Sequence, residues 1–262
     1  MTRETQEKLA GSLTAETTEL LPFLPYLLQD FWELGSAPSI MAGLIKKHAS
    51  LPEGTRVLDL ACGKGAVSVK VAQKLRVKVK GVDLIPDFIE VARQKAEEHN
   101  VGDLCEFAVG DINQAVEREN GYDAVILGAV GNVLGDPAET LRKLKQTVKT
   151  GGYILIDEGY LPDDGKQEDV LYNNYEFLTQ KQWEALFKGA GLELVEAVDT
   201  FDSPENLDSD SGMAAITARA NELIQKYPDK KELFEGYIRS QQNEYDDIDN
   251  SVVCVTWILK KL

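Results

Sequence analysis

Residues 57–65 read Val57-Leu58-Asp59-Leu60-Ala61-Cys62-Gly63-Lys64-Gly65, an apolar run that passes directly into a turn with two glycines. Apolar residues then recur at helical spacing from Val67 to Leu75. Glycine allows unusual backbone torsions and close approach of a ligand to the main chain, and the first turn of a helix offers free N–H groups. The segment therefore predicts a strand, a ligand-binding turn and a helix.

Short runs of strand-forming residues alternate with helical patterns from residue 55 to about 159, and two more strand-like runs follow. The seven runs are Arg56–Leu60, Lys78–Val82, Cys105–Val109, Tyr122–Leu127, Tyr153–Asp157, Leu192–Val198 and Val252–Leu259. Strands separated by helices predict βαβ units and a parallel sheet whose strands are buried on both faces.

Three acidic residues stand at or just beyond the ends of successive predicted strands. They are Asp59, Asp83 and Asp111. Aspartate is a favoured helix-start residue, so each of them alone is more simply a cap. Together they lie at one edge of a parallel sheet, where open α/β folds bind ligands, and Asp83 has the position of a ribose-binding carboxylate. We therefore interpret this edge as a cofactor site.

At these residues the sequence resembles the class I S-adenosylmethionine-dependent methyltransferases. The resemblance covers about residues 55–160 and implies an α/β fold: a seven-stranded, mainly parallel, doubly wound Rossmann-like sheet with a helical lid. It also implies that S-adenosylmethionine is bound, with S-adenosylhomocysteine as the product. The implied cofactor-binding residues are Asp59, Ala61, Cys62, Gly63, Gly65, Asp83, Leu84, Asp111, Ile112, Gly128 and Ala129.

The resemblance also gives these residues separate roles. The turn would wrap the methionine part of the cofactor, Asp83 would hold the ribose hydroxyls, and Asp111 would meet the adenine edge. Gly128 and Ala129 would face the reacting methyl group. Ala61 stands where the family usually has the first glycine of the turn, a small change that narrows the room above it.

Two other functions remain open at this stage. A nicotinamide-dependent oxidoreductase on a related sheet would need a third glycine for its pyrophosphate, and Ser68 stands there. Asp59 beside the turn suits a sulfonium and its ammonium group better than a pyrophosphate. A non-catalytic module that binds S-adenosylmethionine is the second alternative, because the same cofactor site would serve it.

The spacing of apolar runs changes near residue 55 and again near residue 160, and we divide the chain into four segments. We expect an N-terminal helical cap at 1–50, a methyltransferase core at 51–200, a helical lid insertion at 201–248 and a final core strand at 249–262. Pro22, Pro25 and the Gly35–Pro38 segment break the cap into short helices. The last two predicted strands are about fifty residues apart, a gap too long for a plain loop.

The charge of the chain bears on its partners. Of 262 residues, 28 are basic and 44 acidic, which gives a net charge of −16, and residues 151–262 contribute 23 of the acids against 10 of the bases. Such a charge repels nucleic acids and anionic lipid surfaces. We therefore expect a small-molecule acceptor beneath the lid and neither a nucleic-acid nor a membrane partner, and the oligomeric state stays open.

The composition gives expectations about metals and location. Only two histidines occur, neither beside other ligands at metal-binding spacing, so no metal site is predicted. Three cysteines without a C-x-x-C motif suit a reducing cytoplasm. No signal-peptide pattern opens the chain, and no apolar run approaches the roughly 18 residues of a membrane span.

Methyl transfer requires little from side chains beyond holding the nucleophile, the methyl carbon and the sulfur in line within a dry pocket. If the acceptor must lose a proton, a base is needed. The base candidates are Glu158, Asp157, His48 and Tyr172.

Overall fold

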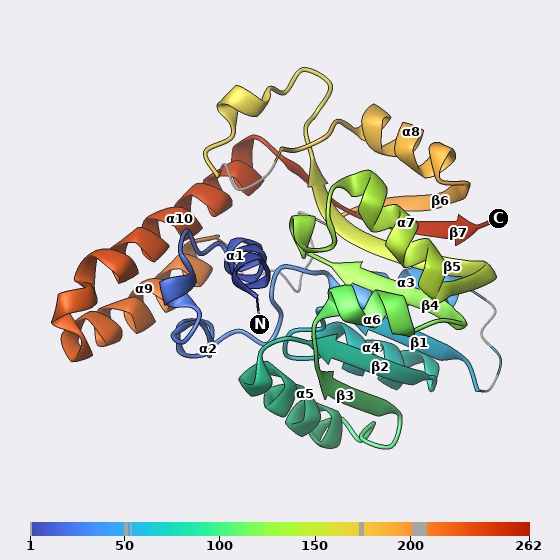
Figure 1. Cartoon of the computed structure of the whole chain (residues 1–262), viewed down its shortest axis with the longest axis horizontal. Coiled ribbons are helices and arrows are strands. Elements are labelled where there is room, and N and C mark those ends of the chain that lie inside the picture. Colours follow the sequence, from blue (N-terminus) through green and yellow to red (C-terminus); the bar gives the residue numbers. More distant parts are fainter. Residues whose placement is uncertain (1, 50–51, 53, 173–175, 201–208) are drawn as a thin grey trace.

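Seven strands form one mixed sheet in the order β3-β2-β1-β4-β5-β7-β6 (Figure 1). The computed structural model describes residues 2–49, 52, 54–172, 176–200 and 209–262. The first five strands are parallel, whereas β7 runs antiparallel to β5 and β6. The strands are β1 (Arg56–Leu60), β2 (Lys78–Asp83), β3 (Cys105–Val109), β4 (Tyr122–Gly128), β5 (Val148–Tyr160), β6 (Leu192–Asp199) and β7 (Val253–Lys261). The predicted fold class is confirmed.

Helices cover both faces of the sheet because successive strand residues point to opposite sides. Val57 packs in one core cluster and Leu58 in the other, and both are fully buried. The first cluster includes α3 (Pro38–His48), α4 (Ala66–Leu75) and α5 (Pro86–Glu98), and the second includes α6 (Ile112–Arg118), α7 (Pro137–Thr147) and α8 (Gln180–Gly189). Burial on both faces explains why the run Ala124–Leu127 of β4 does not alternate with polar residues.

Four further helices gather at the carboxyl ends of the parallel strands (Figure 1). We call them the cap: α1 (Arg3–Ser12), α2 (Leu24–Leu27), α9 (Ser209–Lys226) and α10 (Lys231–Asn250). They share a separate apolar cluster, in which the rings of Phe23 and Phe234 meet edge to face at 5.1 Å. Short 3-10 turns lie at η1 (Thr18–Leu20), η2 (Gly131–Leu134), η3 (Gln167–Asp169) and η4 (Pro228–Lys230).

The helices of the N-terminal segment differ from expectation in two ways. Helix α1 lies within the expected helical cap, but its mostly polar sequence has weak apolar periodicity, so it was not predicted as a separate helix. Helix α3 falls inside the predicted cap, yet its buried Met41 and Ile45 pack on the sheet, so it belongs to the core. The first part of the predicted lid, 201–208, lies outside the described residues, and the described part continues two residues further, to Asn250.

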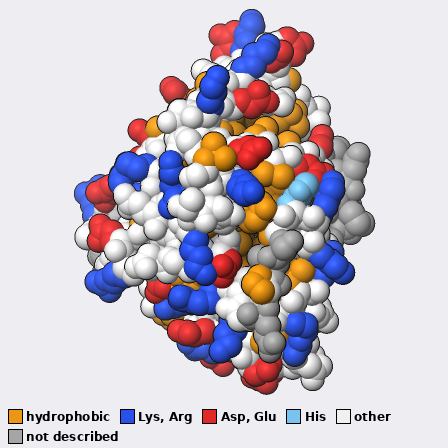
Figure 2. All heavy atoms as spheres, turned by 90° about the vertical axis from the view of Figure 1, so that its right-hand side faces the viewer, with side chains coloured by type: hydrophobic (Ala, Val, Ile, Leu, Met, Phe, Trp, Pro, Cys, Tyr) orange, Lys and Arg blue, Asp and Glu red, His pale blue; other side chains and the backbone are white. Residues whose placement is uncertain are grey.

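The molecular surface opposite the cap carries basic and acidic side chains intermixed around a hydrophobic strip (Figure 2). Among the described residues, no helix is both long enough and apolar enough to cross a bilayer.

Candidate active site

The turn between β1 and α4 depends on left-handed backbone at three positions. Ala61, Gly63 and Gly65 have φ values of 55°, 52° and 77°. A Cβ atom at Gly65 would lie 2.7 Å from the Cβ of Ala92, so only glycine fits there. Ala61 adopts the same region with a side chain, which costs about 1 kcal/mol.

Asp83 joins the end of β2 to this turn. Its carboxylate accepts the backbone N–H of Gly63 and that of Ile85, each at 2.9 Å. The side chain is 7% exposed, and this burial raises the pKa of its carboxyl group. Because each oxygen retains a further lone pair, Asp83 can still accept hydrogen bonds from a ligand hydroxyl.

Asp59 lies beneath the turn rather than on its surface. Its carboxylate is buried and accepts the hydroxyl proton of Ser68 on α4 at 2.6 Å. Burial raises the pKa of Asp59 to about 7. Ser68, the residue that replaces a third glycine, thus forms a buried link between strand and helix. Cys62 packs beside Gly81, and burial raises its thiol pKa, so it remains a protonated thiol.

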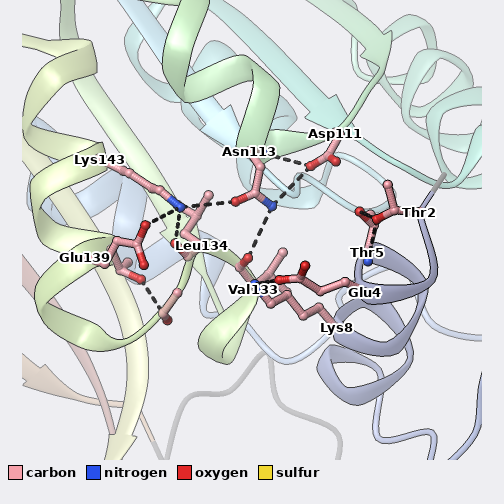
Figure 3. Close-up of polar contacts among 12 residues, drawn as sticks. Thr2, Glu4, Thr5, Lys8, Asp111, Asn113, Val133, Leu134, Glu139 and Lys143 are labelled. Atoms are coloured by element: carbon pink, nitrogen blue, oxygen red, sulfur yellow. Dashed lines mark hydrogen bonds and ion pairs between the residues drawn. The ribbon is translucent and has the colours of Figure 1, made fainter.

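Asp111 caps the helix that follows β3. It accepts the backbone N–H of Asn113 at 2.8 Å, and the amide of Asn113 reaches the carbonyl of Val133 at 3.3 Å. Figure 3 shows this group facing helix α1 across the carboxyl edge of the sheet. Ile112 is buried, and Leu84 is half-buried after β2.

The end of β4 lies under the chain segment that enters α3. A Cβ atom at Gly128 would lie 3.0 Å from the Cβ of Ser36, so the absence of a side chain lets this segment approach. Ala129 has a φ of 53°, and its N–H donates to the carbonyl of Asp157 at 3.0 Å. The next residue of the segment, Ala37, donates its N–H to the Asp157 carboxylate at 2.9 Å.

Lys64 binds the chain segment after α2 to the turn between β1 and α4. Its buried ammonium donates to the carbonyls of Leu28 and Phe31, both at 2.5 Å, and Trp32 Nε1 donates to the Lys64 carbonyl at 3.0 Å. Burial lowers the pKa of Lys64 to about 8. Sequence reasoning missed this role, although a lysine between two turn glycines, downstream of an aromatic-rich segment, was the available signal.

A cavity of about 410 Å³ adjoins the ends of β4 and β5. Helices α1 and α10 form its other walls, together with residues 129–133. Three of the four base candidates line this cavity: Asp157, Glu158 and Tyr172. Burial raises the pKa of Asp157 and that of Glu158 to about 7 each.

The fourth base candidate, His48, does not reach the cavity. Its ring pairs with Glu196 of β6, and its carbonyl accepts the hydroxyl of Tyr153 at 2.8 Å. Tyr153 lies in the part of β5 far from Asp157, so His48 sits toward the opposite edge of the sheet, and this candidate was wrong.

The cavity also brings in carboxylates that the sequence did not single out. They come from the cap helices and are Glu7 and Glu16 near α1 and Glu244 and Asp247 on α10. Their positions depend on how the cap folds over the sheet, which no local pattern reports. Within the described residues no group of three metal-ligating side chains occurs.

The chain is similar in sequence to known methyltransferases. Residues 51–202 match the sequence model of a family described as a methyltransferase domain. A malonyl-[acyl-carrier protein] O-methyltransferase from Halalkalibacterium halodurans is 24% identical over 222 residues, which cover 76% of this chain and 80% of that protein. A ribosomal protein L11 methyltransferase from Exiguobacterium sp. is 32% identical over 100 residues, or 38% of this chain and 31% of that protein.

Solved structures agree on the fold. A SAM-dependent methyltransferase from Geobacter sulfurreducens, crystallised with S-adenosyl-L-homocysteine, superposes with a TM-score of 0.74 at 22% identity and covers 92% of this chain and 98% of that one. By sequence, the chain spans about half or less of the length of several curated relatives that it matches.

Proposed function

Because the chain belongs to the class I S-adenosylmethionine-dependent methyltransferase family, we propose that it binds S-adenosylmethionine and methylates a small molecule. The cofactor would lie along the turn after β1 and the ends of β2, β3 and β4, and the acceptor would occupy the cavity beside β5. The observation that carries the proposal is the segment from Leu34 to Ala37, because it touches both places. Leu34 lies against Gly63, and Ala37 is bonded to Asp157 at the cavity wall.

The residues present fit this cofactor. Gly63 and Gly128 let the segment from Leu34 to Ser36 cross close to the turn and to the end of β4, where a Cβ atom would lie 3.2 Å from Leu34 and 3.0 Å from Ser36. Asp83 and Asp111 supply carboxylate acceptors, which suit hydroxyl and amine groups and repel phosphate. When bound, the cofactor supplies a methyl group on a positively charged sulfur. The chain contributes positioning and exclusion of water.

The choice of a small acceptor is supported by the cavity. Its volume of about 410 Å³ lies in the range of small-molecule pockets, and the cap helices cover it. One relative, the ribosomal protein L11 methyltransferase, is named for a protein acceptor. The size of the acceptor therefore requires a separate experiment. The alternative of a nicotinamide cofactor is disfavoured by Ser68, because its hydroxyl is committed to Asp59.

Calorimetric titration of the purified chain tests the cofactor. S-adenosylhomocysteine and S-adenosylmethionine are the ligands, with NADH as the comparison. We expect micromolar affinity for the first two and none for NADH. Asp111→Ala should weaken binding at least about tenfold, equivalent to about 1.4 kcal/mol.

Asp136→Ala is the matched control. Asp136 caps α7 as Asp111 caps α6, with a hydrogen bond of 2.8 Å to the N–H of Glu139. Both substitutions remove a helix cap, at about 1 kcal/mol each, but only Asp111 lies in the proposed site. Equal loss of cofactor affinity in the two variants, or binding of NADH alone, would refute the proposal.

A further inference from the structure

The cavity wall is strongly asymmetric in charge. Among the residues that the structure describes, six carboxylate side chains and one basic side chain, Lys8, line it. Lys8 already pairs with Glu4 at 3.0 Å. Burial also raises the pKa of Cys254, another lining residue, to about 12, so its thiol adds no charge. Within the described part of the chain, no lining cation is left to bind an anionic acceptor.

Several of these carboxylates already have structural partners. Both oxygens of Asp247 are occupied by backbone N–H groups, those of Leu171 and Tyr172, at 2.8 and 2.7 Å. Glu244 accepts the hydroxyl of Thr14. These two carboxylates hold the loop after η3 and the chain after α1 in place, so a ligand is not needed to explain them.

Glu158 differs from its neighbours. Its Oε1 accepts the N–H of Gly159 at 3.1 Å, and Oε2 accepts no hydrogen bond from a described residue. The side chain lines the cavity. Its predecessor, Asp157, binds the N–H of Ala129 through its carbonyl, next to the Gly128 position assigned to the methyl group. Glu158 therefore combines an available oxygen with a location beside the proposed reaction centre.

We propose that the acceptor is a small primary or secondary amine that enters as a cation, and that Glu158 is the carboxylate that binds its nitrogen. This inference rests on the proposed methyltransferase function. Opposite charges attract across a low-dielectric cavity, whereas a carboxylate acceptor would meet lining carboxylates and no unpaired lining cation among the described residues. An alcohol would leave Glu158 without a charged partner in a partly desolvated wall.

The same contact provides the proton step that an amine needs. The bound ammonium gives one N–H proton to the Glu158 carboxylate, which frees the nitrogen lone pair. That pair forms the new bond to the methyl carbon while the carbon–sulfur bond breaks and leaves its electrons on sulfur. The product is a methylated ammonium, and Glu158 leaves the step as a carboxylic acid. The pKa of Glu158, about 7, is closer to the pKa of an alkylammonium group than the pKa of an exposed glutamate is, which favours this proton transfer.

Ligand-observed NMR and calorimetry on the full chain saturated with S-adenosylhomocysteine test the inference. The probes are small alkylamines and arylalkylamines, with alcohols and carboxylates of the same carbon skeletons. We expect amines to bind at least about tenfold more tightly than alcohols and carboxylates to show no binding. Raising the salt concentration should weaken amine binding and leave alcohol binding unchanged.

Glu158→Gln separates charge from shape, because glutamine keeps an oxygen for the Gly159 N–H. We expect it to weaken amine binding at least about tenfold and to leave alcohol binding unchanged. Glu168→Gln is the control, since Glu168 is exposed and pairs with Lys166 outside the cavity.

Four results would overturn the inference: equal binding of amines and alcohols, a preference for carboxylates, no amine binding at about 10 mM, or unchanged amine binding in Glu158→Gln. If that variant fails to fold, the salt dependence of the wild-type chain decides. Saturation with S-adenosylhomocysteine is measured first. Its failure removes the methyltransferase proposal, whereas saturation without amine preference removes only this inference.

Discussion

The carboxylate of Asp83 holds the backbone N–H of Gly63 at 2.9 Å and so locks the end of one strand to the turn that follows another. Strands β1 and β2 are neighbours, yet they are joined in sequence only through α4. This bond therefore fixes the shape of the turn independently of the strand ladder. If the turn holds the cofactor, its geometry and cofactor affinity depend on the same carboxylate.

Asp83→Asn is expected to lower both stability and affinity. Asparagine offers one carbonyl oxygen and one amide, so either the Gly63 or the Ile85 N–H would face a donor, at about 1–3 kcal/mol. Calorimetry with S-adenosylhomocysteine should show at least about tenfold weaker binding. Asp123→Asn is the control, because Asp123 accepts the Arg56 N–H at 2.9 Å near the opposite edge of the sheet. It should lose stability and keep affinity; the reverse result would contradict the assignment.

Lys64→Met should loosen the segment that crosses the turn. The carbonyls of Leu28 and Phe31 would lose their buried donor, while methionine preserves much of the side-chain volume. Hydrogen–deuterium exchange is expected to accelerate at least about tenfold in peptides spanning 28–37. Lys74→Met, an exposed change on α4, the helix that follows the turn, should leave that exchange unaltered. Equal protection in both variants would mean that the lysine does not fasten the segment.

The strands were predictable because their burial leaves a plain trace in the sequence. A strand covered by helices on both faces must be apolar, as in the buried run Ala124–Leu127 of β4. Strands β1 and β3 begin and end at the predicted residues. The acids at the sheet edge were predictable for a related reason, since parallel strands carry their carboxyl ends to one side. Asp83, Asp111 and Asp157 all lie there.

The cap was less predictable because its contacts join distant parts of the chain. Helix α1 has a mostly polar sequence and packs against η2 beside the cavity, so apolar periodicity did not indicate it as a separate helix. The bonds from Lys64 to Leu28 and from Glu244 to Thr14 link residues 36 and 230 positions apart. His48 was wrongly predicted as a base for a different reason. It is close to β1 in sequence, but the direction of α3 places it away from the cavity.

Asp59 should make the stability of the protein fall with rising pH. An exposed aspartate titrates near 3.9, whereas burial raises the pKa of Asp59 to about 7. Between these values the folded protein keeps a proton that the unfolded chain has lost. The free energy of unfolding therefore decreases as pH rises, by up to about 1.4 kcal/mol per pH unit from this group.

Asp59→Asn isolates that contribution, because asparagine can still accept the Ser68 hydroxyl but cannot ionise. Urea unfolding without cofactor at pH 5, 6 and 7 should show a flatter dependence in the variant than in the wild type. Other buried carboxyl groups with raised pKa, among them Asp157 and Glu158, also make the free energy of unfolding decrease as pH rises. The variant should therefore keep part of the pH dependence. Asp103→Asn, at an exposed position, should reproduce the wild-type slope. Parallel curves for wild type and Asp59→Asn would disprove the burial argument.

Tyr172→Phe tests whether a base candidate has a structural role instead. The Tyr172 hydroxyl donates to the carbonyl of Gly11 at 2.6 Å and so ties α1 to the cavity wall. Because this side chain is 5% exposed, loss of the bond leaves a carbonyl without its donor, and we expect the free energy of unfolding to fall by about 1 kcal/mol. Tyr26→Phe removes a hydrogen bond to Glu222 at a 40% exposed position and should cost about 0.5 kcal/mol or less.

Binding then distinguishes the two roles of Tyr172. If the hydroxyl only positions α1, the phenylalanine variant should bind the amine probes within about threefold of the wild type, since Glu158 keeps its carboxylate. If the phenol itself bound the acceptor nitrogen, affinity would fall as far as in Glu158→Gln while stability changed little. Measuring unfolding and probe binding on the same two tyrosine variants separates these outcomes, because a structural tie moves the first quantity and an acceptor contact moves the second.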